Sequence, residues 1–161
     1  MPRGQDSPPS GSKQRPWLLQ PGETLGPDGR YVVETRLGFG SFSEIYKVCD
    51  THAGRYCALK YAKPDANFST ILRTENNVLE SLQDTIPRGY GAARHFDYCV
   101  SDTQSDHASY IVMELLGTSL SDVRKRVKKF SFAQTAHVGI GVLDLLEQLH
   151  NQGFIHRDVK P

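Results

Sequence analysis

The chain has 161 residues, 38% of them hydrophobic, and its 19 Lys and Arg residues nearly balance 18 Asp and Glu residues. This is enough for the core of one globular domain, and the net charge of +1 gives no general reason to expect nucleic acid or an anionic membrane as a partner. No apolar run is long enough for a membrane span or a signal peptide, so we expect a cytoplasmic or nuclear protein. The three cysteines lack CxxC spacing, which argues against a disulfide framework and a metal site.

The first residues, about Met1 to Arg15, are mostly Pro, Gly, Ser and charged residues without apolar periodicity. Such a segment cannot bury enough surface to offset the entropy of ordering it. Residues 1–30 are therefore predicted to form a flexible tail and lead-in. Within the lead-in, the apolar run Trp17-Leu18-Leu19 is expected to pack back on the domain, and a loose segment is the alternative.

Three strands and a helix are predicted after the lead-in. Strands are expected over 31–38, 45–48 and 56–60, and the short turns between them predict an antiparallel meander. The helix is expected from Ser69 to Gln83, because apolar residues recur there at helical spacing on one stripe. The residues of this stripe are Ile71, Leu72, Val78, Leu79 and Leu82.

Two further strands, over about 93–100 and 110–114, are predicted on either side of a polar surface loop at 101–106. The chain up to Gly117 is thus expected to form a five-stranded antiparallel sheet with one helix. Only helical signals follow Gly117, so the fold class is predicted to be α+β.

Two helices are predicted beyond Gly117. Residues 119–122 and 131–134 have the spacing of capping boxes and mark the starts of a short helix and a long helix, which Gly153 is expected to end. Inside the long helix, Gly139 and Gly141 each cost about 1 kcal/mol relative to alanine. We therefore expect these two glycines to pack closely against a neighbouring element.

A glycine-rich loop joins the first two strands. Its residues are Gly38, Phe39, Gly40, Ser41, Phe42 and Ser43. Glycines in this position let the backbone approach a phosphate group and present its N–H groups without interference from Cβ atoms. The alternative is an ordinary hairpin turn, and the loop by itself does not decide between the two interpretations.

Lys60 ends the third strand, and Glu75 lies among the apolar residues of the following helix. Because an unpaired buried carboxylate is costly, an ion pair between these two side chains is an economical solution. Such a pair would hold the ammonium of Lys60 where it can reach the phosphates of a nucleotide. The alternatives are a solvated lysine at a strand end and a glutamate at the edge of the stripe that reaches solvent.

The last six residues are His156-Arg157-Asp158-Val159-Lys160-Pro161. Asp158 could accept a hydrogen bond from a substrate hydroxyl, and Lys160 could neutralise charge on a phosphoryl group during transfer. By itself this segment could equally be a charged surface turn. Its position after a glycine-rich turn, a strand lysine and a helix glutamate is the order that a protein kinase requires.

The short helix carries five cations within six positions, for which a solvated face is the first interpretation and an acidic substrate or partner the second. These residues are Arg124, Lys125, Arg126, Lys128 and Lys129.

Together, these motifs resemble the eukaryotic protein-kinase family, and most closely the casein kinase 1 superfamily with its tau-tubulin kinase and vaccinia-related branches. The resemblance covers about Tyr31 to Pro161, and it includes residues 37–46, 58–60, 112–120 and 153–158. It implies a protein-kinase-like fold of two lobes with ATP bound between them. The N-lobe and hinge would extend over 31–117, and the C-lobe would begin at 118–161.

The resemblance also implies a role for each matching residue and a substrate class. For ATP binding, it indicates the loop Gly38 to Ser43, Ile45, Ala58, Lys60, the gatekeeper Met113, and Glu114 and Leu116 of the hinge. For phosphoryl transfer, it indicates Lys60, Glu75, the catalytic aspartate Asp158 and its partner lysine Lys160. The implied substrates are serine or threonine hydroxyls of proteins, acidic or phosphorylated ones among them, and no nucleic acid is implied.

The sequence departs from the family pattern in two ways. Ser43 replaces the third glycine of the loop, and the asparagine and the DFG aspartate that bind magnesium in the family would lie beyond Pro161. Magnesium is therefore expected only in a complete kinase, and the chain as written is expected to be inactive, because charge stabilisation dominates phosphoryl transfer. A non-catalytic ATP-binding or scaffold module, and an incomplete product without a stable fold, remain alternatives.

Overall fold

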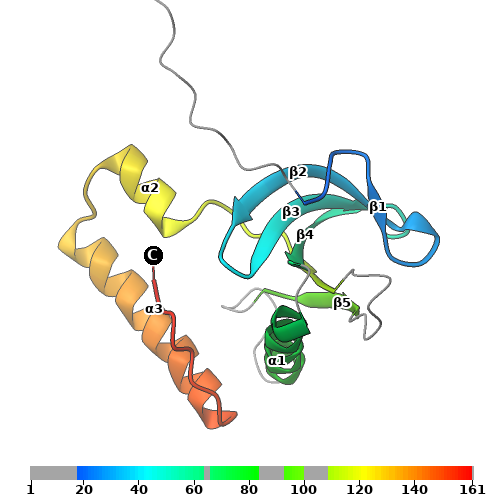
Figure 1. Ribbon diagram of the computed structural model, residues 1–161. Coiled ribbons are helices and arrows are strands. Elements are labelled where there is room, and N and C mark those ends of the chain that lie inside the picture. Colours follow the sequence, from blue (N-terminus) through cyan, green and yellow to red (C-terminus); the bar gives the residue numbers. More distant parts are fainter. Residues whose placement is uncertain (1–17, 64–65, 84–92, 100–108, 161) are drawn as a thin grey trace, which may run out of the picture.

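The computed structural model describes residues 18–63, 66–83, 93–99 and 109–160. They form a curled antiparallel sheet with one helix packed beside it, and two further helices follow to one side (Figure 1). The strands are β1 (Thr24–Leu25), β2 (Tyr31–Phe39), β3 (Ser43–Asp50), β4 (Arg55–Ala62), β5 (His95–Cys99) and β6 (Tyr110–Glu114). The helices are the short 3-10 helix η1 (Pro27–Gly29), α1 (Ala66–Gln83), α2 (Leu120–Val127) and α3 (Phe132–Asn151).

The strand order is β1-β2-β3-β4-β6-β5, and every neighbouring pair is antiparallel. The α+β class is confirmed, but the expected number of strands was wrong, because the sheet has six strands rather than five. The additional strand β1 has only two residues and pairs with the start of β2. Hydrogen bonds from Gly22 N to Val33 O and from Val33 N to Glu23 O, both 2.8 Å long, extend this pairing. Two residues are too short a segment for periodicity to show.

The lead-in is anchored to the sheet by a buried polar cluster. Leu19 is buried, as expected for this segment, and its N–H donates to the Tyr46 hydroxyl at 3.0 Å. The neighbouring N–H of Leu18 donates to Glu44 at 3.2 Å. Glu44 is only 4% exposed, and it also accepts from Tyr46 and pairs with Arg36 at 3.3 Å. The expected tail at residues 1–15, Trp17 and the expected loop at 101–106 lie outside the described residues.

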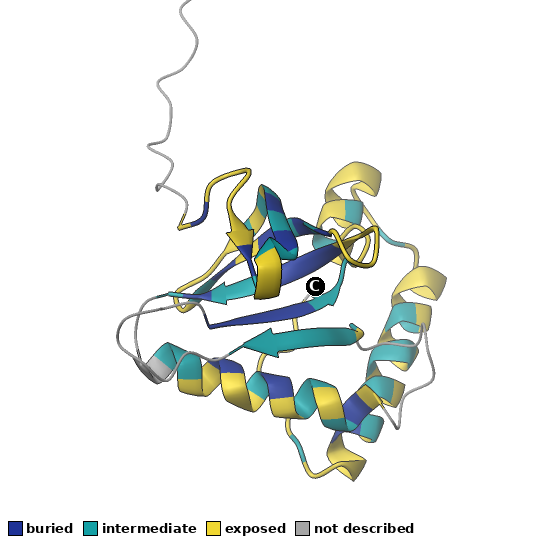
Figure 2. Cartoon of the chain, turned by 90° about the vertical axis from the view of Figure 1, so that its right-hand side faces the viewer, coloured by how far each residue is buried: buried dark blue, intermediate teal, exposed yellow. Residues whose placement is uncertain are grey.

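The sheet buries side chains on both faces, because successive residues of a strand point to opposite sides. On one face, Leu59 of β4 and Val112 of β6 belong to a large core that the lead-in helps to cover. On the other face, Ala62 and Ile111 pack with Leu72 of α1. Figure 2 shows these buried positions in the central strands and on the side of α1 that faces them.

The apolar stripe of α1 was predicted correctly except at one residue. Leu72 and Leu82 are buried, but Ile71 is 47% exposed. Neighbouring residues of a helix lie about 100° apart, so a helix that turns Leu72 toward the sheet turns Ile71 away from it. Asn76, one turn after Leu72, is buried on the same side.

Both predicted helices beyond the hinge are present. Ser131 and Gln134 form a complete capping box at the start of α3, whereas Ser119 caps the N–H of Asp122 at 3.1 Å without the reciprocal backbone bond. The expected close packing at Gly139 and Gly141 was wrong, because a Cβ at either position would meet no described atom within 4 Å beyond the nearby backbone of α3 itself. Among the described helices, none is both long and apolar enough to cross a membrane.

A buried ion pair fixes the turn between β3 and β4. The Asp50 side chain is fully buried, and both of its oxygens accept hydrogen bonds from Arg30 at 2.8 Å. The N–H groups of His52 and Ala53 also donate to Asp50, each at 3.2 Å. The guanidinium of Arg30, helped by these amides, lowers the pKa of Asp50 to about 2.

This pKa predicts an acid-sensitive contribution to stability. Because the folded pKa lies below the ordinary value of 3.8, the contribution is complete above that value and is lost as the pH falls toward 2. We expect Asp50→Asn to remove this pH-dependent contribution to stability. Between pH 6 and pH 2, the unfolding free energy of wild type should therefore fall by about 2 kcal/mol more than that of the variant. Urea unfolding across this range measures the difference, and parallel profiles would contradict the prediction.

Candidate active site

Strand β4 lies between β3 and β6 and brings four candidate residues to one face of the sheet. Lys60 is paired in register with Ile45 of β3, and Ala58 is paired with Met113 of β6. Directly opposed residues share a face, and so do residues two apart on one strand. Ile45, Ala58, Lys60 and Met113 therefore lie together on the side of the sheet that α1 covers.

An ion pair joins this face to helix α1. The Nζ atom of Lys60 bonds to Oε2 of Glu75, as expected from the position of that carboxylate in the apolar stripe. The two side chains are 24% and 34% exposed, so the pair lies at the edge of the packed region rather than in open solvent. An ammonium has three N–H donors, and one carboxylate leaves donors for a further anion.

The glycine-rich loop forms the tip of the β2–β3 hairpin. The N–H of Gly40 donates to Ser43 O at 2.8 Å, and Gly38 is paired with Ile45 after a bulge in β2. A Cβ added at Gly38 would meet no described atom within 4 Å, and one at Gly40 would meet only Ser43 O, at 3.8 Å. The space beside both glycines is thus open to a ligand that contacts the backbone.

The candidate hinge residues follow the end of β6. Met113 and Glu114 are half-buried, and Leu116 is 63% exposed. The N–H of Glu114 donates to Arg94 O at 2.7 Å, and the Glu114 carboxylate accepts from the N–H of Arg94 at 3.3 Å. The N–H of Glu114 is therefore already used within the protein and is not available to a ligand.

The last described residues lie after α3, where Gly153 adopts a positive φ of 82° and the chain runs back beside the helix (Figure 1). Lys160 Nζ bonds to Asp158 at 2.6 Å, and the N–H of Asp158 donates to His156 Nδ1 at 3.2 Å. The ammonium of Lys160 lowers the pKa of Asp158 below its ordinary value, and the carboxylate can accept a further hydrogen bond.

The structure thus brings the candidates together in two groups. The loop, Lys60, Glu75 and the strand residues form one group around β4, whereas Asp158 and Lys160 form another after α3. In the part of the chain that the structure describes, the polar contacts of Asp158 and Lys160 are with each other and His156, and none reaches Lys60. Both Asp158 and Lys160 are more than two-thirds exposed.

The first group fits a nucleotide by the chemistry of its donors. It offers a cation, an open backbone turn and apolar side chains for a base, which are the usual components of such a site. For a metal ion, no group of three or more His, Cys, Asp or Glu side chains with suitable positions occurs among the described residues.

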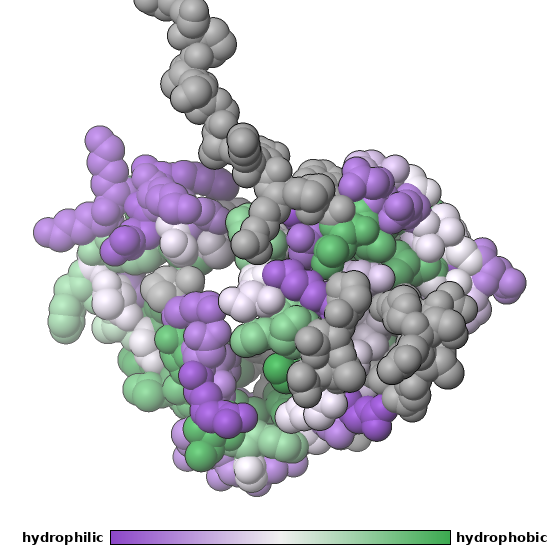
Figure 3. Space-filling model, viewed as in Figure 1, coloured by the Kyte–Doolittle hydropathy of each residue, from purple (hydrophilic) through white to green (hydrophobic). Residues whose placement is uncertain are grey.

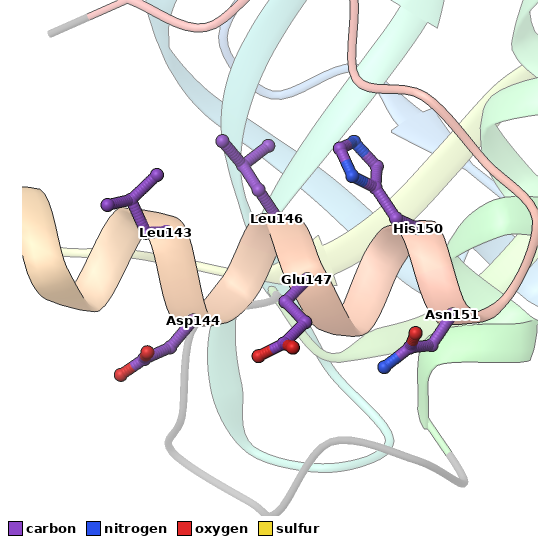
Figure 4. A pocket seen from close by; sticks show the side chains of 6 residues that line it. All are labelled: Leu143, Asp144, Leu146, Glu147, His150 and Asn151. Carbon is purple, nitrogen blue, oxygen red and sulfur yellow. The ribbon is translucent and has the colours of Figure 1, made fainter.

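An open hollow along α3 belongs to neither group (Figure 4). It is lined by Leu143, Asp144, Leu146, Glu147, His150 and Asn151. Its lining mixes apolar and charged side chains and has no contact that indicates a ligand.

Sequence reasoning assigned no role to Lys63, whose side chain contacts the glycine-rich loop. No periodicity or motif singles out this lysine, since its contacts depend on how β4 ends beside the β2–β3 hairpin.

Comparison with known proteins identifies the family of the chain. The protein kinase domain family matches residues 31–161. A probable serine/threonine-protein kinase of Dictyostelium discoideum is 35% identical over 83% of the chain, which spans 26% of that protein. A Caenorhabditis elegans protein also named as a serine/threonine-protein kinase is 34% identical over 82% of the chain, and a probable one of Streptomyces coelicolor is 32% identical over 83%.

The chain spans 36% of the Caenorhabditis elegans protein and 20% of the Streptomyces coelicolor protein, so it corresponds to a minor part of each relative. The family match nevertheless includes every candidate residue, from the glycine-rich loop to Lys160. Protein kinases as a family use ATP, usually with magnesium, and act on proteins. The chain belongs to the protein kinase family, and its relatives are serine/threonine-protein kinases.

Proposed function

We propose that the protein carrying this chain is a serine/threonine protein kinase of the casein kinase 1 superfamily. It transfers the γ-phosphoryl group of ATP to a protein hydroxyl. The observation that carries the proposal is the ion pair of Lys60 with Glu75, on the same face of the sheet as the open glycine-rich loop. The superfamily assignment is supported by the sequence patterns at residues 37–46 and 112–120.

The group around β4 binds the nucleotide. Ile45, Ala58 and Met113 supply apolar contacts for a base, and Glu75 holds Lys60 so that its remaining N–H donors meet phosphate oxygens. Because the pair is half-buried, its charges are screened less than those of a surface pair. The protein thus fixes a positive charge in place before the ligand arrives, which is how positioning and electrostatics contribute to phosphoryl transfer.

Asp158 binds the hydroxyl group of the substrate. Its ionised carboxylate accepts a hydrogen bond from a serine or threonine side chain and orients the oxygen for attack. Lys160, bonded to Asp158 at 2.6 Å, lowers the pKa of the carboxylate and places a cation beside the transferring group. ATP, when bound, supplies the phosphoryl group, and magnesium in a complete kinase neutralises its developing charge.

The basic residues in the last turn of α2 and directly after it suggest the substrate class. Arg124, Lys125, Arg126, Lys128 and Lys129 are all exposed. Asp122 pairs with Lys125 at 2.7 Å, and Figure 3 shows a hydrophilic surface over this helix. A cluster of one sign attracts oppositely charged partners. We therefore assign acidic or phosphorylated protein segments as preferred substrates.

Activity is tested on the complete natural protein that contains these residues. We expect it to transfer labelled phosphate from ATP to a protein, and we expect Lys60→Met and Asp158→Ala each to reduce the rate by about 100-fold or more. The loss follows because one variant removes the phosphate cation and the other removes the acceptor for the hydroxyl. Transfer that is unaffected by both substitutions would contradict the proposal, and ATP binding without any transfer would identify a non-catalytic nucleotide-binding module instead.

Substrate preference is tested by reversing two of these charges in the same protein, at Arg124 in α2 and at Lys128 directly after it. The double variant Arg124→Glu, Lys128→Glu should raise KM for an acidic peptide by about tenfold and leave KM for a neutral peptide unchanged. The effect on the acidic peptide should shrink at high salt, because screening weakens exposed charge interactions. An equal change for both peptides would show that α2 does not select acidic substrates.

A further inference from the structure

Lys63, one residue beyond the end of β4, binds three consecutive carbonyl groups of the glycine-rich loop. Its ammonium donates to Gly40 O at 2.7 Å and to Ser41 O at 3.0 Å. Its backbone N–H donates to Phe42 O at 3.0 Å. A single residue thus holds the whole tip of the β2–β3 hairpin from the neighbouring strand.

These bonds determine which way the loop amides point. In a planar trans peptide, the C=O and the following N–H point in opposite directions. Holding the carbonyls of Gly40 and Ser41 toward Lys63 therefore turns the N–H groups of Ser41 and Phe42 away from it. Within the described residues, neither N–H has an acceptor. Successive free N–H groups in a turn are backbone donors of the kind that bind anions.

Without Lys63, this orientation would be weakly determined. Gly40 has no Cβ, so the peptide planes beside it can rotate at little steric cost. Charge-assisted hydrogen bonds from an ammonium to carbonyl oxygens are stronger than neutral ones and can select one orientation.

A second contact ties the same tip to helix α1. The ring of Phe42 packs against the ring of Phe68 with centroids 5.2 Å apart and a tilt of 58°. Phe68 is half-buried against the core below α1, and Glu75 comes from the same helix. Helix α1 therefore contacts the glycine-rich loop and also carries Glu75, the ion-pair partner of Lys60.

We propose that Lys63 is a positioning residue for the phosphate groups of the nucleotide. By holding the carbonyls of Gly40 and Ser41, it presents the N–H groups of Ser41 and Phe42 to phosphate oxygens before the nucleotide binds. The inference rests on the proposed function, since it concerns the same site. It predicts an effect on phosphate-bearing ligands and none on the binding of the nucleoside.

The test measures dissociation constants of the complete natural protein that contains these residues, for ATP, ADP and adenosine, by calorimetry. Lys63→Met keeps the length of the side chain and removes its donors. It should raise the dissociation constants for ATP and ADP about tenfold, as expected for the loss of a charge-assisted hydrogen bond. Adenosine binding should stay within about twofold of wild type, which also shows that the variant is folded. Lys63→Arg should restore most of the affinity, because a guanidinium can donate to the same carbonyls.

Two further variants separate positioning from other effects. Arg55→Met is the matched control, because Arg55 is a cation of β4 on the opposite face of the sheet from Lys60, where its guanidinium packs over the ring of Phe96. This variant should bind all three ligands as wild type does. Lys63→Gln retains neutral N–H donors, so it should bind ATP better than Lys63→Met does. If Lys63→Gln and Lys63→Met bind ATP equally weakly while Lys63→Arg binds it as wild type does, Lys63 contacts the phosphates through its charge. That result would overturn the positioning role.

The remaining outcomes are also decisive. If Lys63→Met binds ATP as tightly as wild type, the inference fails while the proposed function stands. If Lys63→Met loses as much affinity for adenosine as for ATP, the role of Lys63 is structural and the inference fails as well. If wild type binds neither ATP nor ADP, the proposed nucleotide site is wrong and the inference falls with it.

Discussion

The pairing of β4 with β3 on one side and β6 on the other is the constraint on which the site depends. It places Lys60 opposite Ile45 and Ala58 opposite Met113, and it brings Lys63 beside the hairpin tip. Because side chains alternate along a strand, a shift of one residue would turn Lys60 into the opposite core. The buried side chains of Leu59 and Val112 on that other face prevent such a shift.

Helix α1 contributes both to the hydrophobic core and to the ion pair of the site. Its buried leucines fix the helix against β5 and β6, and the same contact holds Glu75 within reach of Lys60. The contact between the tilted rings of Phe68 and Phe42 extends this support to the glycine-rich loop. The glycine-rich loop, β4 and α1 therefore present one surface, and the hydrophobic core beneath α1 supports it.

Much of the fold could be predicted because its signals are local. Alternating residues and turn signals marked β2, β3 and β4, and Ser131 with Gln134 marked the start of α3 through bonds within four residues. Features that depend on distant neighbours were missed or wrong. Strand β1 exists because β2 offers a free edge, and the exposure of Ile71 depends on which side of α1 meets the sheet.

For the site, the sequence by itself determined the order of the loop, Lys60, Glu75 and Asp158. It also predicted the pairing of Lys60 with Glu75, because a carboxylate in an apolar stripe needs a cation. Only the tertiary structure decided that Lys63 binds the loop carbonyls and that the N–H of Glu114 is already used by Arg94. The physical reason is that hydrogen bonds between strands depend on register and on where each strand ends, which residue types alone do not specify.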